Sequence, residues 1–384
     1  MLEKKVFEGE EMFPELKIGE FTARVPIIQG GMGVGISLSG LAAATANEGG
    51  IGVISSVGLG LLEKVGRKNY RKNNLICLRK EIRKAKAMSD GVIGLNVMVA
   101  VSDYDDIVKV AIEEEIDILF LGAGLPLKIP EGLTLEYLKS VKTKIVPIVS
   151  SDRAAKLIFN SWEKKYDHIP DAVVVEGPKA GGHLGFKAEQ IDDLHYALEK
   201  IIPKVIKILE PFKQRFGKDI PVIAAGGIFS GEDIYKFLKM GAAGVQMGTR
   251  FVATDECDAD IKFKEQFVNC HKEDIGIIKS PVGLPGRAII NKFLTDVTSG
   301  IRMPFNCPWK CLKTCKMKQS LYCIADALMK AKIGNLTGGF SFAGVNAYRI
   351  KQIVSVKELM ESLRKEFEET VLKLQGIKLA NMII

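Results

Sequence analysis

The feature that most restricts the fold of this chain is an alternation of short apolar strands with helices along residues 25–247. Strands are expected at 25–29, 51–55, 92–99, 116–121, 145–149, 172–176, 221–225 and 244–247. Helices are expected between them at 37–48, 75–88, 104–114, 133–141, 153–165, 191–216 and 232–239, the first capped by Ser37 or Ser39 and the sixth interrupted near Pro203 and Pro211. Eight strands that alternate with helices favour an α/β fold with a closed parallel barrel, the (β/α)8 or TIM barrel, over an open doubly wound sheet.

The strand at 172–176 leads into a glycine loop that ends in a histidine. Three consecutive valines in this strand suit a position that is covered on both faces of a sheet. Gly181 and Gly182 then allow the backbone to approach a flat ligand closely, and His183 titrates near neutral pH. His183 is therefore a candidate functional residue. The alternative is a loop histidine that only hydrogen-bonds a neighbour.

Residues that directly follow the strands are the other candidates, because the active site of a closed parallel barrel lies at the carboxyl ends of its strands. They occur at 30–33, 96, 122–124, 150, 176–183, 226–227 and 248–249. A dinucleotide-binding (Rossmann) interpretation of the first loop is disfavoured. Its glycines at 31, 33 and 35 have the wrong spacing, and the second strand ends in Ser55 and Ser56 rather than in an acidic residue.

Small residues follow the last two strands, where a barrel commonly binds phosphate. They lie at 225–227 and at 248–249. We expect backbone N–H groups of these loops, together with the start of the helix after Ser230, to bind a dianion. The alternative is that the glycines only permit tight turns. Arg250 either assists binding or is a charge at the rim.

A phosphate at this position outlines a cofactor that lies across the barrel mouth, and flavin mononucleotide (FMN) fits the outline. Its ring requires close approach of the backbone at 30–32 and at 181–182. Its polar edge requires amide partners such as Asn96 and either Gln29 or Gln246. The sequence therefore predicts an FMN site that uses loops from several strands.

With these residues assembled, the chain resembles the flavin-dependent nitronate monooxygenase family, formerly called 2-nitropropane dioxygenases, and the related enoyl-acyl-carrier-protein (ACP) reductase II. The resemblance is carried by segments 26–32, 94–97, 176–185, 225–228 and 247–251, and more weakly by 280–285 and 342–347. It implies a barrel that holds FMN, a small and mostly helical domain inserted after strand eight, and His183 as the catalytic histidine. It also implies phosphate ligands at Gly226, Gly227, Gly248 and Thr249.

The activity implied by this resemblance is that of an FMN-dependent oxidoreductase with a small-molecule substrate. The first expectation is a nitronate monooxygenase that oxidises alkyl nitronates with dioxygen, with His183 near the flavin ring. The alternative is an enoyl-ACP reductase II that reduces trans-2-enoyl thioesters with NAD(P)H as electron donor. A third hypothesis is a catalytically silent flavin- or metal-binding protein that senses redox state. Lys179 either attracts an anionic substrate or points to solvent.

The complete set of expected site residues combines these arguments. The catalytic residue is His183, no metal ligand is assigned, and the cofactor-binding residues are Gly30, Gly31, Met32, Asn96, Glu176, Gly181, Gly182, Ala225, Gly226, Gly227, Gln246, Met247, Gly248 and Thr249.

The chain is expected to divide into a barrel at 1–253, an inserted lid or substrate domain at 254–350, and a helix at 351–384 that returns to the barrel. The insert contains Cys307, Cys311, Cys315 and Cys323, which depart from the family pattern. On one straight helix the first and third would lie about 12 Å apart. That is too far for one zinc ion, and the spacing differs from that of bacterial iron–sulfur motifs. A metal or cluster, reduced structural thiols and a redox-active pair remain the alternatives.

Bulk properties exclude several classes of protein. The net charge of +8 is spread along helices rather than gathered with aromatic residues, which argues against nucleic-acid binding. The sequence contains neither an apolar run of about 18 residues nor an N-terminal apolar segment, so a cytoplasmic protein without membrane insertion is expected. Seven cysteines in 384 residues do not indicate a secreted disulfide scaffold. A homodimer is compatible with the sequence.

Overall fold

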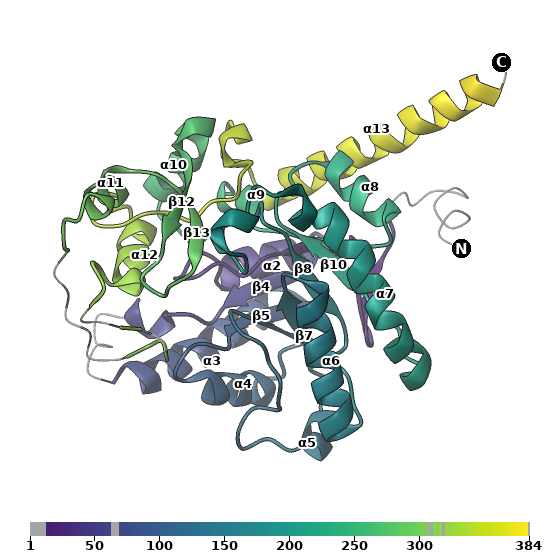
Figure 1. Cartoon of the computed structure of the whole chain (residues 1–384), viewed down its shortest axis with the longest axis horizontal. Helices are drawn as coiled ribbons and strands as arrows, with labels where there is room; N and C mark the ends of the chain where they lie inside the picture. The colour runs from purple at the N-terminus through teal and green to yellow at the C-terminus, as the bar shows by residue number, and fades with distance from the viewer. Residues whose placement is uncertain are drawn as a thin grey trace.

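The computed structural model describes residues 13–62, 69–303, 305, 307, 310–313, 315–316 and 319–382, with side chains as far as residue 374. Eight parallel strands form a barrel with helices on its outside (Figure 1). They are β3 (Ile27–Gln29), β4 (Gly52–Ser55), β5 (Ile93–Met98), β6 (Ile118–Gly122), β7 (Lys144–Val149), β8 (Val173–Glu176), β10 (Val222–Ala225) and β11 (Gly244–Met247). A parallel bridge between Ile28 and Ile51 closes the first strand onto the second. The predicted (β/α)8 barrel is confirmed.

The helices between the strands follow the predicted order, and α9, which comes after the last strand, was not predicted. They are α2 (Ser39–Asn47), α3 (Tyr70–Met88), α4 (Tyr104–Glu113), α5 (Leu135–Ser140), α6 (Asp152–Tyr166), α7 (Leu198–Phe216), α8 (Gly231–Lys239) and α9 (Thr249–Val252). The predicted interruption of the sixth helix is wrong, because α7 continues through Pro203 and Pro211. Both prolines are exposed, so the carbonyl groups that lose an N–H partner face water.

The start of α2 is capped from a distant part of the chain, and neither Ser37 nor Ser39 caps it as predicted. Asp258 Oδ2 accepts hydrogen bonds from the backbone N–H groups of Leu38 (2.7 Å) and Leu41 (3.4 Å). A carboxylate at this end also interacts favourably with the helix dipole. The segment after the last barrel strand is therefore attached directly to the helix that follows the first.

An N-terminal hairpin covers the amino-terminal end of the barrel. It consists of β1 (Leu16–Ile18) and β2 (Phe21–Ala23), which pair antiparallel. Leu16 and Ile18 are fully buried and pack in one cluster with Phe120 and the inward-facing side chains of the other barrel strands. No element was predicted for these residues from the sequence. Because it closes one end of the barrel, ligand access is left at the other end.

The chain after the barrel adds helices and one antiparallel pair of strands. The elements are α10 (Ile261–Asn269), β12 (Ile275–Lys279), β13 (Pro285–Ile289), α11 (Lys292–Thr298), α12 (Ile324–Lys332) and α13 (Val356–Met382). The short strand β9 (Gly182–His183) pairs with β13 and makes a three-stranded sheet. A mostly helical domain was expected here, and these strands were not predicted. The sheet connects the segment at 254–350 to the loop after β8.

The C-terminal helix α13 packs along α8, with Leu363 and Phe367 buried in the contact. Its far end extends beyond the body of the molecule (Figure 1). The division into three parts at residues 253 and 350 stays a prediction. Among the residues described, no helix combines the length and apolarity that crossing a membrane requires.

Candidate functional site

A pocket of about 290 Å³ lies at the carboxyl ends of the barrel strands, between the barrel and the segment at 254–350. This volume is near the lower end of the range for small-molecule sites. Every residue that sequence analysis assigned to the site lines this pocket. They are Gly30, Gly31, Met32, Asn96, Glu176, Gly181, Gly182, His183, Ala225, Gly226, Gly227, Gln246, Met247, Gly248 and Thr249.

The loop after β3 forms one wall and is fixed by close packing. Ser37 Oγ accepts a hydrogen bond from the backbone N–H of Met32 at 2.8 Å, which closes the loop on itself. A Cβ atom at Gly31 would lie 2.3 Å from Cβ of Asn96, so a larger residue has no room there. Glycine thus allows the first loop to lie against Asn96 at the end of β5.

The amide of Gln29, one of the two alternatives for a ligand-facing amide, has a structural role instead. Gln29 is fully buried, its Nε2 donates to the carbonyl of Gly30, and its Oε1 accepts from the backbone N–H of Val53 at 3.0 Å. Gln246, the other expected amide, lines the pocket. Of the two alternatives, Gln246 rather than Gln29 is therefore the amide that can face a ligand.

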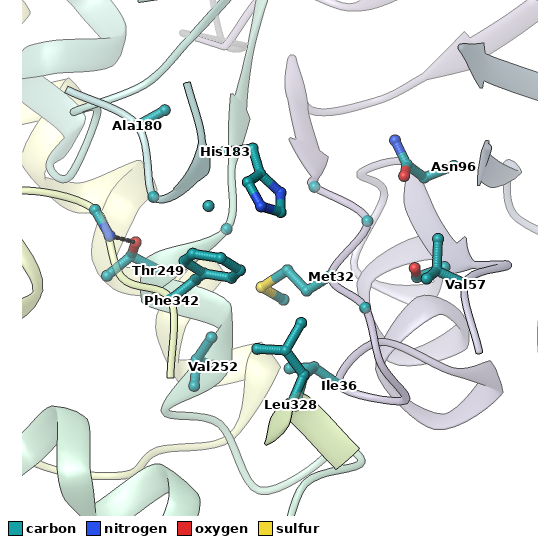
Figure 2. A pocket seen from close by; sticks show the side chains of 18 of the residues that line it. Met32, Ile36, Val57, Asn96, Ala180, His183, Thr249, Val252, Leu328 and Phe342 are labelled. Atoms are coloured by element: carbon teal, nitrogen blue, oxygen red, sulfur yellow. Dashed lines mark hydrogen bonds between the residues drawn. The ribbon is translucent and has the colours of Figure 1, made fainter. Parts of the chain in front are cut away.

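His183 is held at the pocket by strand pairing and by a hydroxyl group. Its backbone pairs with Gly286 of β13, and its Nε2 lies 2.7 Å from Oγ of Ser280, within hydrogen-bond distance. Its ring meets Phe342 edge-on, with ring centroids 5.0 Å apart. Figure 2 shows the imidazole, Phe342 and Met32 turned toward the same space. Burial lowers the pKa of His183 to about 4, so the imidazole is neutral at neutral pH.

Arg287 fixes the loop that carries His183. Its guanidinium is buried and donates through Nη1 to the carbonyl groups of Pro178 and Ala180. These bonds satisfy two loop carbonyls that would otherwise lack a donor in a buried place. Burial lowers the pKa of Arg287, but an arginine remains charged throughout the physiological range. The loop therefore has a fixed shape before any ligand binds.

The loops after β10 and β11 have the shape of an anion-binding cradle. Gly226 and Gly227 have φ angles of 94° and 85°, which favour glycine. Asn346 Nδ2 donates to the carbonyl of Gly227 at 2.7 Å. Thr249 Oγ1 accepts from the backbone N–H of Gly344 at 3.0 Å, as Figure 2 shows, so the hydroxyl proton of Thr249 is left for a ligand.

The start of α8 does not supply donors to this cradle, contrary to expectation. Ser230 and Asp233 form a capping box, in which Asp233 Oδ2 accepts from the N–H groups of Phe229 and Ser230. The N–H of Gly231 donates to Glu366 of α13 at 2.7 Å. The N–H groups of Phe229, Ser230 and Gly231 are therefore occupied by two carboxylates, and an anion in the pocket does not receive them.

Arg250 and Lys179, whose roles were open, both lie outside the pocket lining. The guanidinium of Arg250 stacks over the ring of Phe229, 4.5 Å from its centroid, and Nη1 donates to the Phe229 carbonyl. The side chain of Lys179 is exposed, which supports the solvent-facing alternative.

Glu176 lies at the end of β8 and lines the pocket. Burial raises its pKa to about 7, because an ionised carboxylate is poorly solvated there. A carboxyl group with this pKa exchanges protons readily at neutral pH. The pocket thus holds two titratable groups whose pKa values burial shifts in opposite directions.

Several residues of this site were not predicted from the sequence. Ser280, Phe342, Asn346 and Arg287 all come from the segment at 254–350 and contact residues about 100 to 160 positions away in the chain. The only available signal was the weak family resemblance at 280–285 and 342–347. Local periodicity gives no indication of where such a segment folds back.

A closed eight-stranded barrel with a glycine-lined pocket at the carboxyl ends of its strands is the arrangement of barrel enzymes. The chain belongs to the nitronate monooxygenase family, whose model matches residues 15–366. Membership and the relatives point to an oxidoreductase.

Three relatives illustrate the range of the family. The chain is 27% identical over 277 residues to the (3aS,4S,5R,7aS)-5-hydroxy-7a-methyl-1-oxo-octahydro-1H-indene-4-carboxyl-CoA dehydrogenase of Mycobacterium tuberculosis, a match that covers 72% of this chain and 66% of that enzyme. It is 24% identical to a probable nitronate monooxygenase of Bacillus subtilis, over 90% of this chain and 97% of that one. The structure of FabK from Thermotoga maritima is 31% identical, has a TM-score of 0.69, and covers 92% of this chain and 95% of its own. The chain spans just under two thirds of the Mycobacterium relative.

Proposed function

We propose that this chain is an FMN-dependent oxidoreductase. The observation that carries the proposal is that the glycine loops after the last two strands meet His183 and Asn96 in one pocket. A Cβ atom at Gly182 would meet no atom within 4 Å, so the backbone there borders open pocket space, and this supports placing the flat ring of FMN beside it. FMN, when bound, supplies the two-electron chemistry, and the protein supplies position and proton control.

Each wall of the pocket has a proposed task. The backbone N–H groups at 226–227 and 248–249, with the hydroxyl of Thr249, hold the phosphate. Asn96 and Gln246 offer amide groups to the polar edge of the ring. The neutral imidazole of His183, oriented by Ser280, accepts a proton from the substrate or holds an anionic substrate through a hydrogen bond. The residues present therefore fit the cofactor.

The first proposed substrate class is the alkyl nitronates, with dioxygen as electron acceptor. The family description and the name of the Bacillus relative support this choice. A nitronate is a small anion, which suits a pocket that offers hydrogen-bond donors beside a neutral histidine.

A second candidate is the reduction of an enoyl thioester with NAD(P)H. It is favoured by the match to Thermotoga FabK along nearly the whole chain and by the sequence resemblance to enoyl-ACP reductase II. The lower wall of the pocket is also apolar, with Ile36, Val252 and Leu328 beside Phe342 (Figure 2). An acyl chain would bury apolar surface against these side chains.

An anaerobic reduction experiment separates the two candidates. The purified flavoprotein is mixed without oxygen with an alkyl nitronate or with NAD(P)H, and flavin absorbance is followed. Bleaching by the nitronate alone supports the monooxygenase. Bleaching by NAD(P)H, with colour restored by crotonyl thioester, supports the reductase. A protein that takes up no flavin contradicts the proposal for both.

Replacement of His183 by Ala tests its role directly. We expect FMN to stay bound, because the phosphate and amide contacts are intact, and turnover to fall by about 100-fold or more, the usual contribution of a positioned acid or base. His195→Ala, at an exposed histidine, is the matched control and should keep full activity. Unchanged turnover in His183→Ala would exclude this histidine from catalysis.

A further inference from the structure

Helix α12 borders the pocket with one apolar face. Ile324, Ala325 and Leu328 line the pocket, and residues three or four positions apart share a face of a helix. Ala327 and Ala331, on the adjacent flank, are buried. The helix therefore places Leu328 in the wall of the cavity and two small side chains against the protein behind it.

Close packing behind α12 fixes the position of this wall. A Cβ atom at Gly339 would lie 1.9 Å from the carbonyl oxygen of Ala327, so the chain at 339 approaches the helix too closely for any side chain. The carbonyl of Lys332, the last residue of α12, accepts from the backbone N–H of Asp260 at 2.9 Å. The helix has no room to retreat from the pocket, so the side chain of Leu328 limits the cavity there.

The walls that face Leu328 are apolar as well. Ile36, Val252 and Phe263 line the same pocket and are almost completely buried. They come from the loop after β3, from α9 and from α10. We call the part of the pocket lined by these three side chains and Leu328 the apolar end. A polar group placed there would lose its hydrogen bonds to water and gain none from these side chains.

Met32 and Phe342 lie between the apolar end and His183 (Figure 2). A Cβ atom at Gly248 would be in contact with Sδ of Met32 at 3.4 Å, so the thioether packs on the last barrel loop. The ring of Phe342 packs edge-on against that of Phe340, with centroids 5.0 Å apart. A group that extends from His183 to the apolar end passes a thioether and an aromatic ring. An unbranched methylene chain is the narrowest hydrocarbon that can do so.

We propose that the apolar end binds an unbranched alkyl chain of the substrate and that Leu328 sets the longest chain accepted. The inference rests on the proposed function, because it places the reacting carbon beside His183 and the chain beyond Phe342. It applies to either candidate reaction, since an alkyl nitronate and an enoyl thioester can both carry such a chain. Each methylene group that enters the apolar end should tighten binding about fourfold, until the space is filled and the gain ends.

Binding of straight-chain carboxylates tests the proposal without turnover. A carboxylate is a planar anion, as the nitronate group is, and sodium alkanoates from propanoate to decanoate lengthen the chain one carbon at a time. The FMN-loaded protein is titrated with each, and the change in flavin absorbance gives the dissociation constant. We expect this constant to fall about fourfold per carbon and then to level off. Heptanoate should bind about tenfold more tightly than cyclohexanecarboxylate, which has as many carbons in a wider shape.

The same series, followed by the Tm of the flavin-free protein, separates this inference from the assignment of FMN. A Tm shift that grows with chain length supports the apolar end even in a protein that takes up no flavin. Three results overturn the proposal whether or not FMN is bound: dissociation constants that do not change with chain length, absence of binding throughout the series, and tighter binding of cyclohexanecarboxylate than of heptanoate.

Variants of Leu328 locate the limit on chain length. Leu328→Phe should lower the preference for octanoate over propanoate by about tenfold, and Leu328→Ala should extend the gain to chains about two carbons longer. Ile333→Phe, at an exposed side chain just after α12, is the matched control and should keep the wild-type profile. Leu328 is only partly buried, so we expect both variants to fold, which circular dichroism checks. A wild-type profile in both folded variants overturns the role of Leu328.

Discussion

At the scale of single residues, burial gives the pocket an unusual pair of titratable groups. The pKa of His183 is lowered to about 4 and that of Glu176 is raised to about 7. In both cases burial disfavours the charged form. Near neutral pH the unliganded pocket therefore holds an uncharged imidazole and a carboxyl group that is partly protonated. This arrangement suits proton transfer without a strong fixed charge in the cavity.

The low pKa of His183 predicts a specific loss of stability in acid. Between about pH 6.5 and pH 4 the unfolded chain binds more protons at this histidine than the folded chain does, so stability is present above this window and is lost as pH falls through it. Since one pKa unit corresponds to about 1.4 kcal/mol and the pocket admits some water, we expect His183 to contribute a loss of about 1–2 kcal/mol between pH 7 and pH 5. Urea unfolding of the flavin-free protein and of His183→Asn at both pH values measures the difference.

The titration of Glu176 changes folding stability with pH in the opposite direction, over a pH range that overlaps that of His183. Its raised pKa contributes stability that is present below about pH 4.5 and is lost as pH rises to about 7. Both proteins in the comparison retain this carboxyl group, so its effect cancels in their difference. An equal pH dependence of wild type and His183→Asn would show that the histidine is not buried in its neutral form.

The residues that could be predicted from sequence are those that directly follow a barrel strand. Gly31, Asn96 and Thr249 were placed at the pocket because a parallel barrel brings the ends of its strands together. Gln29 directly precedes the glycine loop after β3, yet its amide hydrogen-bonds the backbone of Gly30 and Val53. The spacing of residues in the sequence does not reveal which partner such an amide takes. Ser280 could not be placed either, since its position depends on how a distant segment folds back.

At the scale of the elements, the turn after β10 depends on glycine for two separate reasons. Gly226 has a φ of 94°, and a Cβ atom there would lie 2.8 Å from the carbonyl oxygen of Gly177. We expect Gly226→Ala to lower the free energy of unfolding by about 2–4 kcal/mol and to weaken FMN binding. Gly217→Ala shares a positive φ but has nothing within 4 Å, so it should cost only about 1 kcal/mol. Equal losses in chemical denaturation would mean that the close contact with Gly177 is unimportant.

The short sheet of β9, β12 and β13 depends on Arg287. In Arg287→Met the carbonyl groups of Pro178 and Ala180 lose their donor, which we expect to cost about 1–3 kcal/mol. Turnover should fall more than FMN content does, because the loop carries His183 rather than the phosphate cradle. Arg215→Met, which removes the ion pairs of an exposed guanidinium with Glu163 and Asp167, should change stability by about 1 kcal/mol or less. Full turnover in Arg287→Met would show that the loop keeps its shape without this contact.

Two elements carry a local sequence signal for their structure that the predictions above did not include. Ser230 and Asp233 have the spacing of a capping box, which indicates that the first donors of α8 are already satisfied. The N-terminal hairpin alternates apolar and polar residues around a Gly19–Glu20 turn, a pattern typical of paired strands. The pairing of β9 with β13 could not be predicted in this way, because β9 has only two residues and so shows no alternation of apolar and polar positions.

At the scale of the whole molecule, the pocket joins parts of the chain that are far apart in sequence. Its walls come from the loop after β3, the ends of β5, β8, β10 and β11, and the segment at 254–350. The carboxyl groups of Asp258 and Glu366 attach later segments to the starts of α2 and α8. A ligand in this pocket therefore contacts several barrel strands and the segment at 254–350, which come apart when the chain unfolds.

Flavin binding should consequently stabilise the entire chain. A ligand at 100 times its dissociation constant adds about 2.7 kcal/mol to the free energy of unfolding, so FMN should raise the Tm of flavin-free protein by a few degrees and in a concentration-dependent way. Riboflavin offers the same ring without the phosphate, and it should produce a smaller shift because the cradle at 226–227 and 248–249 is left without its anion. Differential scanning fluorimetry with both compounds makes the comparison. Equal Tm shifts with FMN and riboflavin would contradict the assignment of the phosphate to these loops. No Tm shift with either compound would contradict the placement of flavin in the pocket.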